Sequence, residues 1–417
     1  MNNAFLKSFL TLQQVYGERA FSSLALNKTL SACKSQDRAL ITKIVYGVLD
    51  EDLKLNYVIS RYVKKMPKGD VLIILKMGTY CLWELSLPVY TVVNDLAELA
   101  KVTEDRRQVG FVNATLKSIS ADAHSFDRWP TDEVERCSVT NSYPEWALRK
   151  LIKDYGKEEA FAIASYKPQN TTSVRLADPS ALSLFDNYES TCFEDAILVS
   201  GKLPQQDGRF TAQSLSSMAI SHAVANVAKS KVLDCCSAPG GKAVYIKQLR
   251  PDLSVVACDI HRHRVELINS YAKRMNVDLE THCLDMTMPK TEWNDAFDVV
   301  LCDVPCSGFG VLDNRPDIKL FRENADISEL MKLQQKILSN CADFVAVGGH
   351  LVFSTCTVFH NENGQNVRKF LKEHANFEQG EISIPQLPQT ANKSSYQFLP
   401  HKDGMQGFYL AVLKRIY

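Results

Sequence analysis

The chain has 417 residues, of which 45% are hydrophobic and 23% charged, a composition typical of globular proteins and not of disordered or fibrous ones. This length predicts two or three domains. No stretch approaches the roughly 18 uninterrupted apolar residues of a membrane span, and the first residues lack the features of a secretory signal. Membrane and exported proteins are therefore excluded from the prediction, and we expect a cytoplasmic location.

The net charge is zero, but the charges are unevenly distributed along the chain. Residues 1–120 contain 16 Lys and Arg against 11 Asp and Glu, whereas the remainder contains 32 against 37. A basic region joined to a mildly acidic one fits an accessory domain that binds nucleic-acid phosphates. The difference is small enough to be a chance distribution as well.

Twelve cysteines are present, and none of them form a Cys-x-x-Cys pair or a Cys/His cluster with zinc spacing. We therefore predict no metal site. Most of these cysteines are expected to be small buried apolar residues, as free cysteines usually are. We expect five of them in particular to be buried in this way: Cys33, Cys81, Cys235, Cys258 and Cys302.

In chain order, residues 1–125 predict a compact domain made only of helices. One helix face is indicated by apolar residues at helical spacing, namely Ile41, Ile44, Val45, Val48 and Leu49. Similar runs continue over 71–83, 92–102 and 109–116, and no strand-like alternation interrupts them.

Residues 126–210 are predicted to be a connector followed by a small α+β module. Polar residues dominate up to about residue 142. A helix is expected over 144–165, with Pro144 near its start, where proline is tolerated. Short apolar segments at 173–176 and 196–199, bounded by Pro and Gly, then indicate strands.

Residues 211–417 are predicted to form an α/β domain of the Rossmann-like class. Short apolar runs predict strands at 232–233, 255–258, 299–302 and 351–353, and helical stretches are expected at 262–275, 326–346 and 361–373. Strands that alternate with helices indicate βαβ units, and therefore a parallel sheet covered on both faces.

A glycine-rich turn follows the first of these strands and reads Cys236-Ser237-Ala238-Pro239-Gly240-Gly241-Lys242. Such turns bind nucleotide-like ligands at the carboxyl ends of parallel strands, because glycines permit close approach and the next helix offers unpaired N–H groups. The turn has neither the G-x-G-x-x-G signature nor the P-loop pattern, so neither NAD nor ATP is favoured.

Acidic residues end the following strands. Asp259 ends the second strand, where a carboxylate can accept hydrogen bonds from ribose hydroxyls, and Asp285 and Asp303 end the third and fourth. Acids at several strand ends around one crevice suit the adenosine and the cationic methionyl portion of S-adenosylmethionine. The alternative is that Asp259 and Asp285 are ordinary solvated acids.

Two cysteines follow strands with polar neighbours. Cys306 lies in Asp303-Val304-Pro305-Cys306-Ser307-Gly308 after the fourth strand, and Cys356 lies in Ser354-Thr355-Cys356-Thr357 after the fifth. A thiolate at this edge can add to carbon 6 of cytosine, which makes carbon 5 able to attack a sulfonium methyl group. Asp303 is the best candidate to hydrogen-bond the pyrimidine ring. The alternative is that either cysteine merely packs.

Together, Ser237–Lys242, Asp303–Gly308 and Ser354–Thr357 resemble the RNA 5-methylcytosine methyltransferase family of the Nol1/Nop2/Sun group. Arg315-Pro316-Asp317-Ile318-Lys319 adds to this resemblance. The N-terminal region resembles the RNA-binding NusB fold, most clearly at Asp37–Leu40 and Val45–Leu49. A chain that combines these two regions resembles the bacterial methyltransferases of this family that modify small-subunit ribosomal RNA.

The resemblance implies Cys356 as the nucleophile and Cys306 as the residue that helps to release the methylated product. It implies that Cys236–Lys242, with Asp259, Asp285 and Asp303, binds S-adenosylmethionine. The implied substrate is an unpaired or flipped cytosine in 16S ribosomal RNA. We expect no metal and no membrane partner, and the sequence is compatible with a monomer but leaves the oligomeric state open. Ser237 departs from the alanine usual in this loop, which bears on cofactor packing and not on the reaction.

Two other functions are compatible with parts of the sequence. A transfer-RNA methyltransferase would use the same chemistry, and only the NusB-like region favours ribosomal RNA. A non-catalytic ribosome-assembly factor would not need the glycine loop, Asp303 and Cys356, all of which are present. A DNA cytosine methyltransferase usually carries its nucleophile at the position of Cys306, so the second cysteine argues against it.

Overall fold

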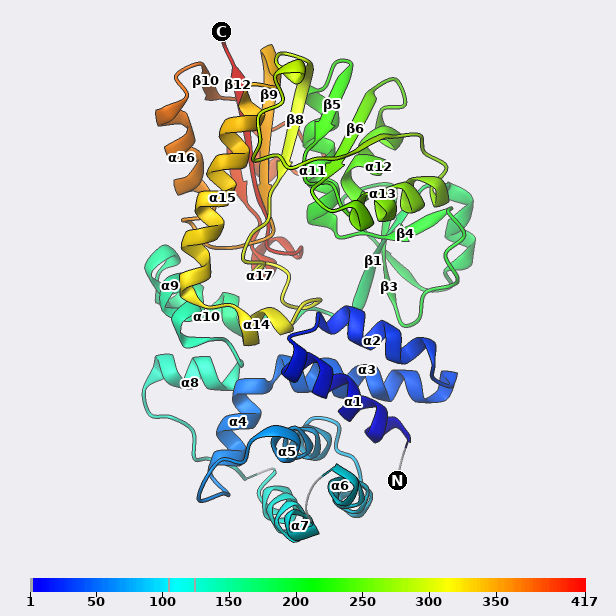
Figure 1. Ribbon diagram of the computed structural model, residues 1–417, viewed down its shortest axis with the longest axis vertical. Coiled ribbons are helices and arrows are strands. Elements are labelled where there is room, and N and C mark those ends of the chain that lie inside the picture. Colours follow the sequence, from blue (N-terminus) through cyan, green and yellow to red (C-terminus); the bar gives the residue numbers. More distant parts are fainter. Residues whose placement is uncertain (1–2, 104–105, 124) are drawn as a thin grey trace. The chain divides into compact units, whose positions relative to one another are not determined.

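The computed structural model describes residues 3–103, 106–123 and 125–417. The chain forms two compact units, and Figure 1 labels most of their helices and strands. The first unit extends to Ser165 and includes Leu312–Arg322, and the second combines Tyr166–Val311 with Glu323–Tyr417. Within the described ranges no helix has both the length and the apolar character needed to cross a membrane.

The first unit is helical, as predicted. Its helices are α1 (Asn3–Glu18), α2 (Ser22–Ser31), α3 (Ser35–Asp50), α4 (Asp52–Ser60), α5 (Gly69–Trp83), α6 (Val89–Thr103), α7 (Arg106–Ala121), α8 (Glu133–Thr140), α9 (Glu145–Tyr155), α10 (Lys157–Ser165) and α14 (Asp317–Phe321). The five apolar residues of α3 that predicted a helix face are all buried. Helix α5 is buried along most of its length and contacts α3, α6 and α7, so it forms the centre of the bundle.

Two predictions in this unit were wrong at the level of single elements. The polar connector contains helix α8, which begins after Asp132, whose carboxylate accepts a hydrogen bond from the backbone N–H of Glu135. The helix expected over 144–165 is two helices. Gly156 separates α9 from α10 with a φ of +85°, a conformation that glycine adopts without steric cost.

A short segment of the second half of the sequence belongs to the first unit. It contains α14, where Lys319 donates a hydrogen bond to Asp50 at 2.6 Å and the buried Asp317 accepts one from Ser22. The prediction kept all of 211–417 in one domain and gave 126–210 to a separate module. Each of the two compact units instead combines segments that lie far apart in the sequence. The division into three domains stays a prediction.

The second unit contains two sheets. The smaller one is antiparallel, with the order β2-β3-β1-β4. Its strands are β1 (Thr171–Leu176), β2 (Tyr188–Ser190), β3 (Ala196–Ser200) and β4 (Phe210–Ala212), with the 3-10 helix η1 (Pro179–Leu184) between the first two. Strands β1 and β3 confirm the two strand segments expected from the sequence, whereas β2 and β4 were not predicted.

The main sheet has the order β10-β12-β9-β8-β5-β6-β7, with β11 paired to β12. Its strands are β5 (Lys231–Asp234), β6 (Ser254–Asp259), β7 (Glu280–Cys283), β8 (Phe297–Asp303), β9 (Val345–Thr355), β10 (Phe377–Gln379), β11 (Ser395–Gln397) and β12 (Tyr409–Arg415). The five strands from β5 to β9 are parallel, and the last three pair antiparallel. The sheet is therefore mixed and not purely parallel as expected, because β12 runs antiparallel between β9 and β10.

Helices cover both faces of this sheet (Figure 1). One face packs against α11 (Leu215–Val227), α12 (Gly241–Leu249) and α13 (Arg262–Arg274), and the other against α15 (Asn324–Ala342) and α16 (Gly364–Glu373). Short 3-10 helices, η2 (Thr291–Trp293) and η3 (Pro388–Thr390), and the helix α17 (Pro400–Asp403) complete the unit. The helix expected over 326–346 ends at Ala342, because β9 already begins at Val345.

Candidate active site

Four parallel strands end at one edge of the main sheet and bring most of the predicted site residues together. Asp234, Asp259, Asp303 and Thr355 are the last residues of β5, β6, β8 and β9. The chain runs from β5 outward to β7 and then returns to β8 on the other side of β5. Open α/β sheets bind ligands at such a switch point, so this edge is the expected crevice.

The glycine-rich loop crosses this edge between β5 and α12. The backbone N–H of Ser237 donates to the carbonyl of Cys258 at 2.8 Å, which holds the loop against β6. Gly240 has a φ of +100°, and a Cβ there would lie 3.2 Å from the Ile268 side chain. Because of both its conformation and its neighbour, a larger residue at Gly240 would displace the loop.

Asp234, which is not among the residues predicted for the site, lies directly before this loop with its carboxylate buried. The Ser237 hydroxyl and the N–H of Cys236 lie near it, but neither carboxylate oxygen accepts a hydrogen bond of normal geometry, and the Ser237 hydroxyl also lacks a partner. Burial raises the pKa of Asp234 to about 7, with a further contribution from the charge of Asp303 that Lys242 opposes. A buried acceptor without a donor fits a site for a cationic ligand. The sequence signal that could have identified Asp234 was its position as the acidic residue that ends the first strand of the main sheet.

Two of the acids predicted at strand ends, Asp259 and Asp285, differ in their surroundings. Asp259 is buried, accepts a hydrogen bond from the N–H of His261 at 3.0 Å, and lies 3.8 Å from the guanidinium of Arg264. Asp285 is exposed and lies two residues beyond the end of β7, not at its end as predicted. Hydrogen bonds from the backbone and the hydroxyl of Thr287 lower the pKa of Asp285. Since β7 is the edge strand, Asp285 is the acid of this group that lies furthest from β8 and β9 in the order of the sheet.

Asp303 connects the glycine loop with the strands that carry the cysteines. One carboxylate oxygen accepts from Lys242 at 2.5 Å, and the other accepts from the hydroxyl of Ser354 at 2.6 Å. Burial alone would lower the pKa of Lys242, but the negative charges of Asp303 and Asp234 raise it overall. Lys242 therefore stays charged and keeps Asp303 beside β9.

The two predicted catalytic cysteines lie side by side. Their sulfur atoms are 3.2 Å apart, and the backbone N–H of Cys356 donates to the sulfur of Cys306 at 3.3 Å. Both side chains are partly exposed. The hydrogen bond with Cys356, together with burial, raises the pKa of Cys306 well above its usual range. Cys306 therefore keeps its proton and can donate it to a neighbouring sulfur.

A group of buried polar residues behind the two cysteines was missed from the sequence. It consists of Ser307, Gln334, Thr357, Glu362 and Asn363, all of which are almost fully buried. The available signal was a run of polar residues, Asn361-Glu362-Asn363, before a helix with a strongly apolar face. Hydrophobic periodicity does not report which loops such polar residues contact.

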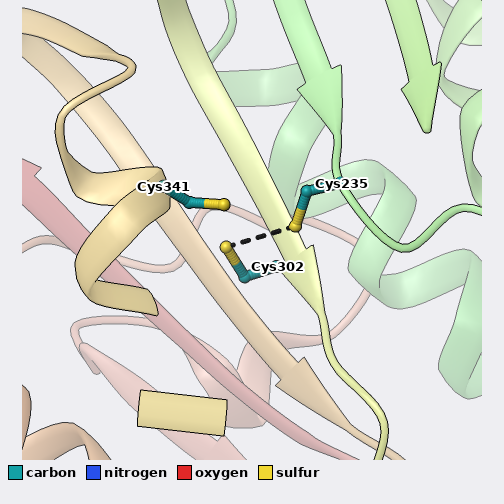
Figure 2. Close-up of side chains that lie close together, drawn as sticks. All are labelled: Cys235, Cys302 and Cys341. Carbon is teal, nitrogen blue, oxygen red and sulfur yellow. Dashed lines mark hydrogen bonds between the residues drawn. The ribbon is translucent and has the colours of Figure 1, made fainter. Parts of the chain in front are cut away.

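A second cysteine cluster lies in the core and not at the strand ends. Figure 2 shows Cys235, Cys302 and Cys341 pointing toward one another, with their sulfur atoms within 4.8 Å. Cys235 and Cys302 are buried, as predicted, and burial raises the pKa of Cys302, which favours the neutral thiol. Apolar side chains of β8, β9 and α15 surround the cluster. These thiols pack as small core residues, and the prediction that the chain binds no metal stays a prediction.

Comparison with known proteins agrees with this architecture. Residues 222–414 match the family of the 16S rRNA methyltransferase RsmB/F, and residues 6–121 match the NusB family. The chain is therefore a methyltransferase with a NusB-family domain at its N-terminus, which confirms the predicted fold class.

The chain belongs to the RsmB/F methyltransferase family. It is 31% identical to the probable ribosomal RNA small subunit methyltransferase B of Bacillus subtilis, over 98% of this chain and 97% of that protein. The corresponding enzyme of Photorhabdus laumondii is 25% identical, over 97% and 96% of the two chains. In fold, the chain is similar to the crystal structure of PH0851, with a TM-score of 0.81, 20% identity and coverage of 98% of both chains. NSun6 from Pyrococcus horikoshii with SFG has a TM-score of 0.55 and 18% identity, and the match covers 66% of this chain and 99% of NSun6.

Proposed function

We propose that this protein transfers a methyl group from S-adenosylmethionine to carbon 5 of a cytosine in small-subunit ribosomal RNA, with Cys356 as the nucleophile. One observation carries the proposal. Two cysteines with sulfur atoms 3.2 Å apart follow adjacent parallel strands, beside an aspartate that is paired with the lysine of the glycine loop. This arrangement combines a nucleophile, a proton donor and a ligand loop at one switch point.

The residues at the glycine loop fit the proposed cofactor. The orphaned carboxylate of Asp234 suits a cationic group, and the loop lies at the switch point with Gly240 close against Ile268. Asp259, Asp285 and Asp303 complete the proposed binding residues together with Cys236–Lys242. When bound, S-adenosylmethionine supplies an electrophilic methyl group on a sulfonium centre.

In the proposed reaction, the thiolate of Cys356 forms a bond with carbon 6 of the cytosine. Electron density then moves to carbon 5, which accepts the methyl group. Asp303 hydrogen-bonds the pyrimidine ring and so stabilises the adduct. Loss of the carbon-5 proton and cleavage of the bond between sulfur and carbon 6 restore the aromatic base, and the neighbouring Cys306 assists this release.

The RNA substrate is proposed from the family and from the names of the relatives, which act on small-subunit ribosomal RNA. A cytosine in a duplex cannot reach two cysteines at a sheet edge, so the target must be unpaired or flipped out. The NusB-family domain is proposed to contact the surrounding phosphates, which makes binding dependent on salt. Such a substrate is consistent with a cytoplasmic enzyme.

The test uses methyl-labelled S-adenosylmethionine with unmodified small-subunit ribosomal RNA, and transfer RNA in parallel. Nucleoside analysis should find the label in 5-methylcytosine from ribosomal RNA alone. Cys356→Ala should lower the rate at least about 1,000-fold, since removal of a nucleophile has effects of this size. Cys192→Ala, a change at an exposed cysteine between β2 and β3, serves as the control and should leave the rate unchanged.

Other outcomes would change the proposal in defined ways. Label in transfer RNA alone would keep the chemistry and replace the substrate. Label in a product other than 5-methylcytosine would contradict the chemistry, and full activity of Cys356→Ala would contradict its role as nucleophile.

A further inference from the structure

The residues that directly follow the two cysteines are hydrogen-bonded to each other. The hydroxyl groups of Ser307 and Thr357 are 2.8 Å apart, and both side chains are at most 1% exposed. Each hydroxyl lies one residue after a cysteine, so this contact connects the two cysteine loops across the strand ends.

Glu362 binds the loop of Cys306 from behind. One carboxylate oxygen accepts from the backbone N–H of Ser307 at 2.9 Å, and the other accepts from the Ser307 hydroxyl at 2.5 Å. The amide of Gln334 donates both to Glu362, at 3.1 Å, and to the carbonyl of Pro305, at 2.9 Å. Both neighbours of Cys306 in the chain are therefore held by one buried carboxylate and its partner.

The next residue, Asn363, binds the loop of Cys356 in the same way. Its side chain accepts from the hydroxyl of Thr355 at 2.5 Å and donates to the carbonyl of Thr357 at 3.0 Å. Glu362 and Asn363 thus hold the two loops from adjacent positions before α16.

We propose that Glu362 is a positioning residue that sets the distance and orientation of Cys306 relative to Cys356. It acts through Ser307 and through the contact of Ser307 with Thr357. This role deepens the proposed function and rests on it. Removing the carboxylate leaves the backbone N–H of Ser307 and one N–H of Gln334 without their acceptor, and it lets the Ser307 hydroxyl turn toward Thr357. The Cys306 loop is then no longer fixed relative to the Cys356 loop.

The test compares Glu362→Ala and Glu362→Gln with the wild-type chain. Glutamine keeps one oxygen that can accept from the backbone N–H of Ser307, so it should rescue part of the effect. Gln335→Ala is the matched control, because Gln335 is the neighbour of Gln334 in α15 and bonds Asn366 of α16 without contacting either cysteine loop. Thermal unfolding of all variants separates loss of stability from loss of position.

The first readout does not depend on methyl transfer. Diamide oxidises two adjacent thiols to a disulfide and is itself reduced to the hydrazine, and peptide mass mapping detects the Cys306–Cys356 product. Glu362→Ala should slow this coupling about 10-fold or more, whereas Gln335→Ala should not. The second readout is methylation, where Glu362→Ala should lower kcat about 10- to 100-fold with a KM for RNA close to wild type, since misplacement by about 1 Å costs rates of this order.

Equal coupling rates in the wild type and in folded Glu362→Ala would overturn the positioning role. The positioning role would also be overturned if Gln335→Ala lowered the coupling rate as much as Glu362→Ala does while both variants melted at the same reduced temperature. General destabilisation would then explain the loss. Slower coupling in Glu362→Ala, with no cytosine methylation by the wild type, would support the positioning role and contradict the proposed function.

Discussion

Replacing Asp234 with asparagine tests the electrostatics of the glycine loop most directly. The Asp234 carboxylate is 1% exposed, has no hydrogen bond of normal geometry, and has a pKa raised by burial to about 7. Asparagine has nearly the same shape and carries no charge. The substitution therefore removes the cost of the buried charge while leaving the backbone of the loop in place.

The size of this effect follows from the pKa. An aspartate that titrates near 3.9 in the unfolded chain and at about 7 in the folded protein differs by about 3 pKa units, which corresponds to about 4 kcal/mol. Because the folded state holds the proton more tightly, the wild type is most stable below about pH 4 and loses this contribution as the pH rises to about 7. Burial of an unpaired amide costs about 1–3 kcal/mol at every pH. The variant should therefore be less stable than the wild type near pH 4 and more stable, by about 1–3 kcal/mol, at pH 8.

Urea unfolding of the ligand-free proteins, followed by circular dichroism at pH 4.5, 6 and 8, measures this difference. A stability difference that is the same at all three pH values would refute the reasoning, since only a titrating Asp234 makes it depend on pH. Under the proposed function, calorimetric titration should also show S-adenosylmethionine binding that strengthens from pH 6 to 8 in the wild type. The variant should bind about 10-fold more weakly or worse and lose this pH dependence.

Three further predictions concern the cysteines and Asp303. Cys306→Ser should slow product release, so that a covalent complex of protein and RNA accumulates as an SDS-resistant band; the lack of such a band would contradict its role in release. Asp303→Asn removes the partner of Lys242 and the proposed ligand of the pyrimidine ring, and should lower kcat about 100-fold in the methylation assay; a rate within threefold of wild type would argue against both roles. Cys341→Ser places a hydroxyl among the apolar residues around Cys302. It should lower the free energy of unfolding, measured in urea, by about 1–3 kcal/mol without changing kcat. A more stable variant would show that this cluster does not pack as an apolar core.

Much of this protein could be predicted because its chemistry is local in the sequence. The glycine loop, the strand-end acids Asp259 and Asp303 and the two cysteines follow apolar runs that predict strands, and parallel strands end at the same edge of a sheet. Helical spacing in the N-terminal region likewise predicted which face of α3 is buried. These patterns work because a helix or strand exposes one face to the core with a fixed period.

Some boundaries of helices were not predicted because the local sequence signal for them was weak. Gly156 ends one helix and lets another begin within a continuous helical pattern, since periodicity does not register one change of backbone direction. The pairing of β12 with β9 was not predicted either. An apolar strand has the same pattern whether its neighbour runs parallel or antiparallel, so pairing direction is a property of the assembled sheet.

By itself, then, the sequence determined the type of fold, the edge of the sheet that carries the chemistry, and the two cysteines that lie there. Only the tertiary structure decided the contacts between residues far apart in the chain. These include the pairing of Lys242 with Asp303, the support of Ser307 by Glu362, and the place of Leu312–Arg322 in the first unit. The reason is physical: a hydrophobic pattern reports that a side chain is buried, whereas the partner of a buried polar group depends on which segments the whole fold brings together.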